Sequence, residues 1–156
     1  MPITYRIDHS RKLIVAAGYG TLTDQDVFGY ERETVALEGI VGYDELLDMT
    51  HVTQLDVTSV DRVQELANLA ASKDVPTAKS RIAVVAPTDV LYGLGRMFQT
   101  YRELVPGNVK QVRIFRTMAE ALKFLNLESP DVAIKAEDKS RDASTGPGNP
   151  SGCGCH

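Results

Sequence analysis

The sequence predicts one α/β domain in which an opening β-hairpin is followed by alternating helices and strands. Two observations support this prediction: short apolar runs of strand type alternate with segments whose apolar residues recur at helical spacing. Such alternation is typical of a mostly parallel or mixed sheet with right-handed crossovers. We therefore expect a sheet of about five strands with about four helices packed on it.

The first third of the chain predicts the hairpin and one helix. Residues 3–7 and 13–22 are apolar runs separated by a polar turn, as in two paired strands. Thr23 has the character of an N-cap for a helix over 24–38, and Gly39 marks the end of that helix. Gly18-Tyr19-Gly20 lacks the strand-to-helix glycine spacing of a phosphate loop, so it predicts a bend or bulge in the second strand.

The remaining elements alternate in the same way. We expect a strand at 45–49 followed by a polar loop at 50–56, and strands again at 81–86 and 109–115. The predicted helices are those over 59–72, 90–104 and 118–127, the second with Thr88 as its cap and the last with a capping box formed by Thr117 and Glu120. Two of these helices have a clear apolar face, made by Val60, Val63, Leu66, Ala67 and Ala70 in one and by Val90, Leu91, Leu94, Met97, Phe98, Tyr101 and Leu104 in the other.

The folded domain is expected to span 1–128. From residue 129 the apolar pattern fades, and 143–152 consists of Gly, Pro, Ser, Thr, Asn and Ala. Such a composition buries too little apolar surface to offset its ordering entropy. We therefore predict that 129–156 is a disordered tail that ends in Cys-Gly-Cys-His.

The charge balance and the hydropathy pattern argue against several classes of partner. The formal charge is −4, with 17 basic and 21 acidic residues dispersed along the chain, which predicts no nucleic-acid binding and no attraction to anionic membranes. The chain has no apolar stretch of signal-peptide or membrane-spanning length, so we expect a cytoplasmic protein without a membrane span. An exposed edge of the opening hairpin suggests a homodimer.

The segment from 47 to 60 resembles the corresponding stretch of STAS domains, the SpoIIAA-like anti-sigma factor antagonist family. The family pattern is an apolar strand, Asp, an apolar residue, Ser or Thr, several loop residues, and Asp-Ser-Ser-Gly opening a helix. Asp48, Thr50, Asp56 and Thr58 occupy the matching positions. The chain departs from the pattern because Val57 replaces the first Ser of that motif and Ser59 replaces its Gly.

The resemblance implies a non-catalytic regulatory domain that binds a protein such as an anti-sigma factor or a kinase-like partner. Thr58 is the residue that corresponds to the phosphorylated Ser of the family. A phosphate there would meet the free N–H groups of a helix N-terminus. The partner-facing loop predicted on this basis comprises Asp48, Thr50, His51, Asp56 and Ser59. The alternative is that the hydroxyl of Thr58 or Ser59 acts only as a helix N-cap.

A more divergent branch of bacterial STAS-like proteins, related in fold to CRAL-TRIO lipid-binding domains, suggests a second function. In this interpretation the domain carries or senses an apolar small molecule or lipid beneath the helix over 90–104. The predicted pocket residues are Tyr92, Leu94, Met97 and Phe98. The alternative is that this stripe is ordinary core, and that Gly93 and Gly95 let the helix approach the sheet closely.

Signals for catalysis or for a cofactor are weak. A third interpretation is a small hydrolase or metal protein centred on His51 with neighbouring carboxylates, but the chain has no nucleophile elbow, phosphate loop or paired-histidine motif. We therefore expect no enzyme activity and no cofactor. Cys153, Cys155 and His156 are soft ligands for zinc or copper at the end of the tail. The alternative is an unstructured end with accessible thiols.

Overall fold

The computed structural model describes residues 2–57, 59–72, 74 and 78–128. Thr58 and the tail from residue 129 onward lie outside the described residues, so the predictions made for them stay predictions. The elements follow one another as β1 (Ile3–Asp8), β2 (Leu13–Thr23), α1 (Asp24–Ala36), β3 (Asp44–Asp56), α2 (Val60–Ala71), β4 (Ser80–Val85), α3 (Asp89–Leu104), β5 (Lys110–Phe115) and α4 (Met118–Phe124).

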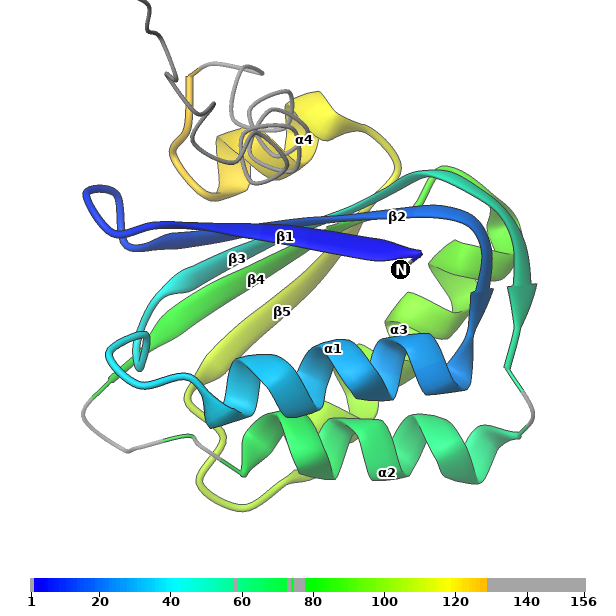
Figure 1. The fold of residues 1–156 in the computed structure, drawn as a ribbon, viewed down its shortest axis with the longest axis horizontal. Helices are drawn as coiled ribbons and strands as arrows, with labels where there is room; N and C mark the ends of the chain where they lie inside the picture. The colour runs from blue at the N-terminus through cyan, green and yellow to red at the C-terminus, as the bar shows by residue number, and fades with distance from the viewer. Residues whose placement is uncertain (1, 58, 73, 75–77, 129–156) are drawn as a thin grey trace, which may run out of the picture.

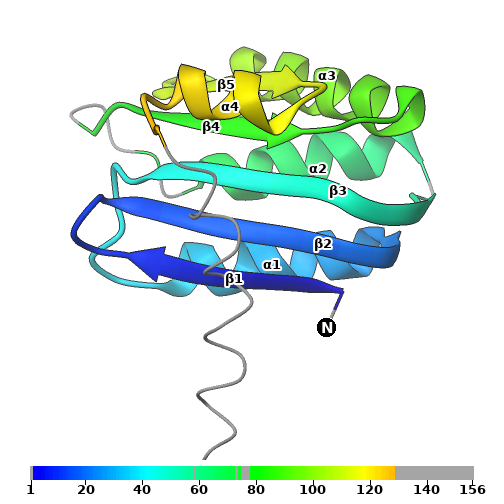
Figure 2. The same cartoon turned by 90° about the horizontal axis from the view of Figure 1, so that it is seen from above.

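The five strands form one mixed sheet in the order β1-β2-β3-β4-β5 (Figure 2). β1 is antiparallel to β2, and every later pair of neighbours is parallel. The predicted fold class, an opening hairpin followed by alternating elements in a mixed sheet, is confirmed.

Helices cover the two faces of the sheet unequally. α1, α2 and α3 lie on one face, and α4 lies on the other face over β4 and β5 (Figure 1). Successive strand residues therefore enter different cores: Ala16 and Val84 face the three helices, whereas Val15 and Val85 join the cluster that contains α4. This alternation follows from the two-residue period of a strand.

The predicted helix starts are confirmed by their capping contacts. Thr23, Ser59, Thr88 and Thr117 are the N-caps of α1 to α4, and each side-chain oxygen accepts a hydrogen bond from the backbone N–H three residues later. Two helices end earlier than expected, with α1 finishing at Ala36 and α4 at Phe124. Helix ends carry a weaker sequence signal than capped starts.

The polar loop expected at 50–56 is wrong. β3 continues to Asp56 and pairs with the second half of β2, with His51 opposite Tyr19 and Asp56 opposite Thr23. This pairing satisfies the backbone groups of the long second strand, and the β-branched residues of the segment suit an extended conformation.

The bulge expected in the second strand is confirmed. The β2–β3 register shifts between Ala17 and Tyr19 and again between Gly20 and Thr21. A Cβ on Gly18 would lie 2.9 Å from the side chains of both Met49 and Val52, so only glycine fits there.

None of the helices in the described part of the chain is long and apolar enough to cross a membrane.

Candidate functional site

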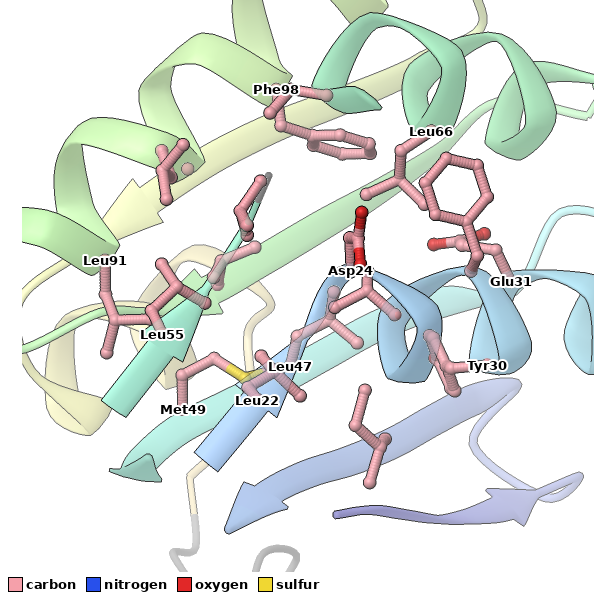
Figure 3. Close-up of a pocket in the computed structure, with 18 of the residues that line it drawn as sticks. Leu22, Asp24, Tyr30, Glu31, Leu47, Met49, Leu55, Leu66, Leu91 and Phe98 are labelled. Atoms are coloured by element: carbon pink, nitrogen blue, oxygen red, sulfur yellow. The ribbon is translucent and has the colours of Figure 1, made fainter. Parts of the chain in front are cut away.

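A cavity of about 140 Å³ lies between the sheet and helices α1, α2 and α3 (Figure 3). We call it the central cavity. Its walls are almost wholly apolar, and its side chains come from β1 to β4 and from all three helices. The large apolar residues around it include Leu22, Leu47, Met49, Leu55, Leu66 and Phe98.

Residue size explains why space remains at this position. Ala16, fully buried on β2, offers only a methyl group, whereas Ile14, two residues earlier on the same face of the strand, is larger. On the far side Gly95 brings α3 against β5, because a Cβ there would lie 3.0 Å from Ile114. Helix α3 thus packs closely on the sheet at β5, while the space above Ala16 stays open. An apolar cavity of this kind holds apolar ligands rather than water.

Arg62 of α2 lies at the rim of the central cavity and bridges to α1. Its Nε donates to the Asp24 carboxylate at 3.1 Å, and its Nη1 lies 2.8 Å from Glu65. Its guanidinium carbon lies 4.1 Å from the centroid of the Phe28 ring, a cation–π distance. The hydrogen bond to Asp24 raises the pKa of the Arg62 guanidinium, so the bridge stays charged at physiological pH.

Two neighbouring residues of α1, Tyr30 and Glu31, line the cavity and carry buried polar groups. Tyr30 is 4% exposed, and its hydroxyl has no hydrogen-bond partner within the described residues. Burial raises the pKa of Tyr30 well above its ordinary value. Burial, followed by the nearby Glu45 carboxylate, raises the pKa of Glu31 to about 8. The Glu31 carboxyl is therefore mostly protonated at neutral pH.

The predicted pocket residues on α3 divide into two pairs. Leu94 and Phe98 line the central cavity, whereas Tyr92 and Met97 are absent from its described lining. The Tyr92 ring instead lies beneath the Arg116 guanidinium, whose carbon is 4.2 Å from the ring centroid. Helical spacing predicts which face of α3 packs on the sheet. It does not distinguish residues that line the central cavity from residues that pack closely against other side chains.

The residues predicted to face a partner do not all lie on the surface. Thr50, Asp56 and Ser59 are exposed, the last as the N-cap of α2. Asp48 is the exception at 8% exposure, because its carboxylate accepts hydrogen bonds from the backbone N–H and the hydroxyl of Thr50. Thr58, the predicted phosphoacceptor, lies outside the described residues.

His51 is not placed at a metal or catalytic cluster. Its exposed ring stacks on Tyr19, with the two ring centroids 5.6 Å apart and the planes 2° from parallel. The described residues contain no group of three or more His, Cys, Asp or Glu that could hold a metal ion. The third interpretation requires His51 and two carboxylates to converge on one metal ion, and the described residues contain no such cluster. The tail ligands lie outside the described residues: Cys153, Cys155 and His156.

The sequence interpretation missed most of the site. Glu31, Arg62 and Phe28 were not singled out, although Glu31 is buried whereas Arg32 and Glu33, which follow it, are exposed. The apolar pattern of α1 is weak, so a helical projection of 24–36 shows no clear buried face to which Glu31 could have been assigned.

A solved structure supports the fold. The chain is similar to an uncharacterized protein of the DUF3478 family with a SpoIIAA-like fold from Shewanella loihica PV-4, with a TM-score of 0.50 and 20% sequence identity. The match covers 79% of this chain and 93% of that chain. No family model matches the sequence, and no curated protein gives a significant match. The protein is therefore an α/β domain with a SpoIIAA-like, or STAS-like, fold.

Proposed function

We propose that this protein is a non-catalytic binding module that holds a small, uncharged, apolar molecule in the central cavity. The observation that supports this proposal is the cavity itself, about 140 Å³ of space with apolar walls beneath three helices. A cavity of about 150 Å³ lined by aliphatic and aromatic side chains stays dry and binds benzene or xenon. The space therefore suits a benzene-sized molecule rather than a whole lipid chain.

The charges at the rim also favour an uncharged ligand. Arg62 already pairs with Asp24 and Glu65, so its positive charge is balanced within the protein. Moving an ionised group from water into the apolar interior would carry a large desolvation cost. Burial of apolar ligand surface is the remaining source of affinity, at about 25 cal/mol per Å².

Titration with toluene, followed by amide chemical shifts in NMR spectra, tests the proposal. We expect saturable shifts centred on residues such as Leu22, Leu55 and Leu91. The variant Leu94→Phe fills the cavity from α3 and should weaken toluene binding at least about tenfold, equivalent to 1.4 kcal/mol. Leu104→Phe, at a position on the same helix that is 71% exposed, is the matched control and should bind as the wild type does. Shifts scattered over the surface, or equal affinity in both variants, would contradict the proposal.

A second candidate function, protein binding, is favoured by two exposed apolar residues at one end of the molecule. Val60 and Val90 are 52% and 63% exposed and begin the adjacent helices α2 and α3 (Figure 1). Ser59, which precedes Val60 in the chain, and Asp56, the last residue of β3, are also exposed. We propose that this end contacts a partner protein, with phosphorylation of Thr58 as its switch. Mass spectrometry of protein purified from its own host tests the switch. We expect one phosphate group that maps to Thr58. Unmodified protein in every growth condition would contradict the switch.

A further inference from the structure

Glu31 separates two cavities of different character. On one side it lines the apolar central cavity, and on the other it lines a smaller cavity of about 50 Å³ that has both polar and apolar walls. We call this second space the polar cavity, and its other walls include Thr34, Glu45, Asp74 and Lys110. Glu31 is 8% exposed, so its carboxyl group belongs to the interior of the domain.

The charged groups around Glu31 are already paired with one another. Lys110 of β5 lies 2.9 Å from Glu45 of β3. Arg102 of α3 donates to both carboxylate oxygens of Asp74, at 2.7 and 2.9 Å. Within the described residues the Glu31 carboxyl forms no hydrogen bond or ion pair. The two cations are thus each paired with another carboxylate, and Glu31 is the third carboxyl group around them.

An unpaired carboxyl in this position tolerates ionisation only if water reaches it, because an isolated buried carboxylate is strongly destabilised. The central cavity is dry while Glu31 is neutral, but it is one of the two spaces through which water can reach the carboxylate once Glu31 ionises. An apolar molecule in that cavity keeps this water out and provides no hydrogen bond in its place. Occupancy of the central cavity and ionisation of Glu31 therefore oppose each other.

We propose that binding of an apolar molecule in the central cavity is coupled to protonation of Glu31, so that the ligand is held when this carboxyl is neutral and released when it ionises. The inference rests on the proposed function of the cavity. The pKa of Glu31, raised to about 8 by burial and by Glu45, places the change just above neutral pH. The paired cations Lys110 and Arg102 oppose this rise, whereas the carboxylate of Asp74 adds to it.

The coupling has a defined sign. Below pH 8 the free protein already carries the proton, so affinity is at its maximum and does not depend on pH. Above pH 8 the free protein must take up one proton to bind, and the dissociation constant rises by up to about tenfold per pH unit. By the same linkage, the bound ligand lowers the acid dissociation constant of Glu31. The factor equals that by which ionisation of Glu31 weakens ligand binding.

Toluene affinity, measured on the full chain between pH 6 and pH 9, tests the coupling. The wild type should bind about tenfold more weakly at pH 9 than at pH 7, whereas Glu31→Gln, which cannot ionise, should bind equally at both. Equal affinity of the wild type at pH 7 and pH 9, or the same loss in Glu31→Gln, would overturn the inference and leave the proposed function standing. Absence of toluene binding at every pH would overturn both.

Carbon-13 NMR of the Glu31 carboxyl gives a second readout that needs no variant. The titration midpoint of this resonance should move to higher pH by more than one unit when toluene is saturating, because the tenfold loss of affinity between pH 7 and pH 9 requires that the bound protein keep its proton at pH 9. Toluene binding with an unchanged midpoint would overturn the coupling. Calorimetry at pH 9 in buffers of different ionisation enthalpy should report uptake of about one proton per toluene bound.

Discussion

The guanidinium of Arg102 is fully buried and pairs with both carboxylate oxygens of Asp74, at 2.7 and 2.9 Å. The same guanidinium donates to Asn108 at 3.2 Å and to the backbone carbonyl of Ala70 at 3.3 Å. These contacts tie α3 to the segment that follows α2 and to the start of β5. One side chain thereby fixes the end of the domain beside which the polar cavity lies.

Loss of this pair is expected to destabilise the protein strongly. In Arg102→Met the Asp74 carboxylate loses its partner in the interior, which should reduce the free energy of unfolding by about 3–5 kcal/mol. Urea unfolding followed by circular dichroism measures the change. The control is Arg113→Met, whose partner Glu103 lies 3.3 Å away at a pair that is 39% and 50% exposed. A surface pair of this kind should contribute less than about 1 kcal/mol. Equal losses in the two variants would contradict the prediction.

Two glycines on α3 should respond oppositely to alanine. Gly93 is exposed with no atom within 4 Å of an added Cβ, so Gly93→Ala should stabilise the protein by about 0.5–1 kcal/mol through helix propensity. A Cβ on Gly95 would lie 3.0 to 3.3 Å from three carbons of Ile114, so Gly95→Ala should destabilise it by about 1–3 kcal/mol. Thermal unfolding of both variants measures the difference. Stabilisation by Gly95→Ala would show that α3 can move away from β5 without loss.

The order of the elements was predictable from the sequence because local signals determine it. Thr23, Thr88 and Thr117 each combine a capping hydroxyl with a following amphipathic segment, and all three begin helices in the structure. The second half of β3 was not predictable in this way, because its residues are mostly polar and pair with β2 across a double register shift. Only the position of a distant strand identifies that segment as sheet.

A pocket beneath α3 was suggested by the sequence, but most of its walls could not be predicted, because they are formed by side chains from seven elements. Leu94 and Met97 both belong to the apolar stripe of α3, but only Leu94 reaches the gap. The same limit applies to Val60 and Val90, which follow the apolar spacing and yet are 52% and 63% exposed in the first turns of their helices. Periodicity indicates which face is apolar but not what lies opposite each residue.

Two buried tyrosines provide a test of hydrogen bonding in the core. The Tyr30 hydroxyl has no partner within the described residues, so Tyr30→Phe should leave stability unchanged or raise it by up to about 1 kcal/mol. The Tyr43 hydroxyl lies 3.0 Å from His9 Nδ1, and Tyr43→Phe should reduce stability by about 1 kcal/mol. Urea midpoints of the two variants measure the contrast. A clear loss of stability in Tyr30→Phe would mean that this hydroxyl has a bound partner such as water.

Glu31 should make the stability of the protein depend on pH in a predictable direction. Its pKa is about 8 in the folded state, above the ordinary value of 4.5 that it regains on unfolding. Between these values the folded state holds a proton that the unfolded state has released, so stability falls as pH rises, by about 1.4 kcal/mol per unit. Below pH 4.5 the contribution of Glu31 is absent, and above pH 8 it is constant.

The variant Glu31→Gln isolates this effect because it removes the ionisation and keeps the shape of the side chain. It should be more stable than the wild type by on the order of 2–4 kcal/mol at pH 8.5, and the difference should nearly vanish at pH 5. Urea unfolding at pH 5, 7 and 8.5 gives the comparison. Glu38→Gln, an exposed position just after α1, is the matched control and should show no such trend. A difference between Glu31→Gln and the wild type that stays constant with pH, or grows toward acid, would mean that Glu31 is already ionised in the folded protein at neutral pH.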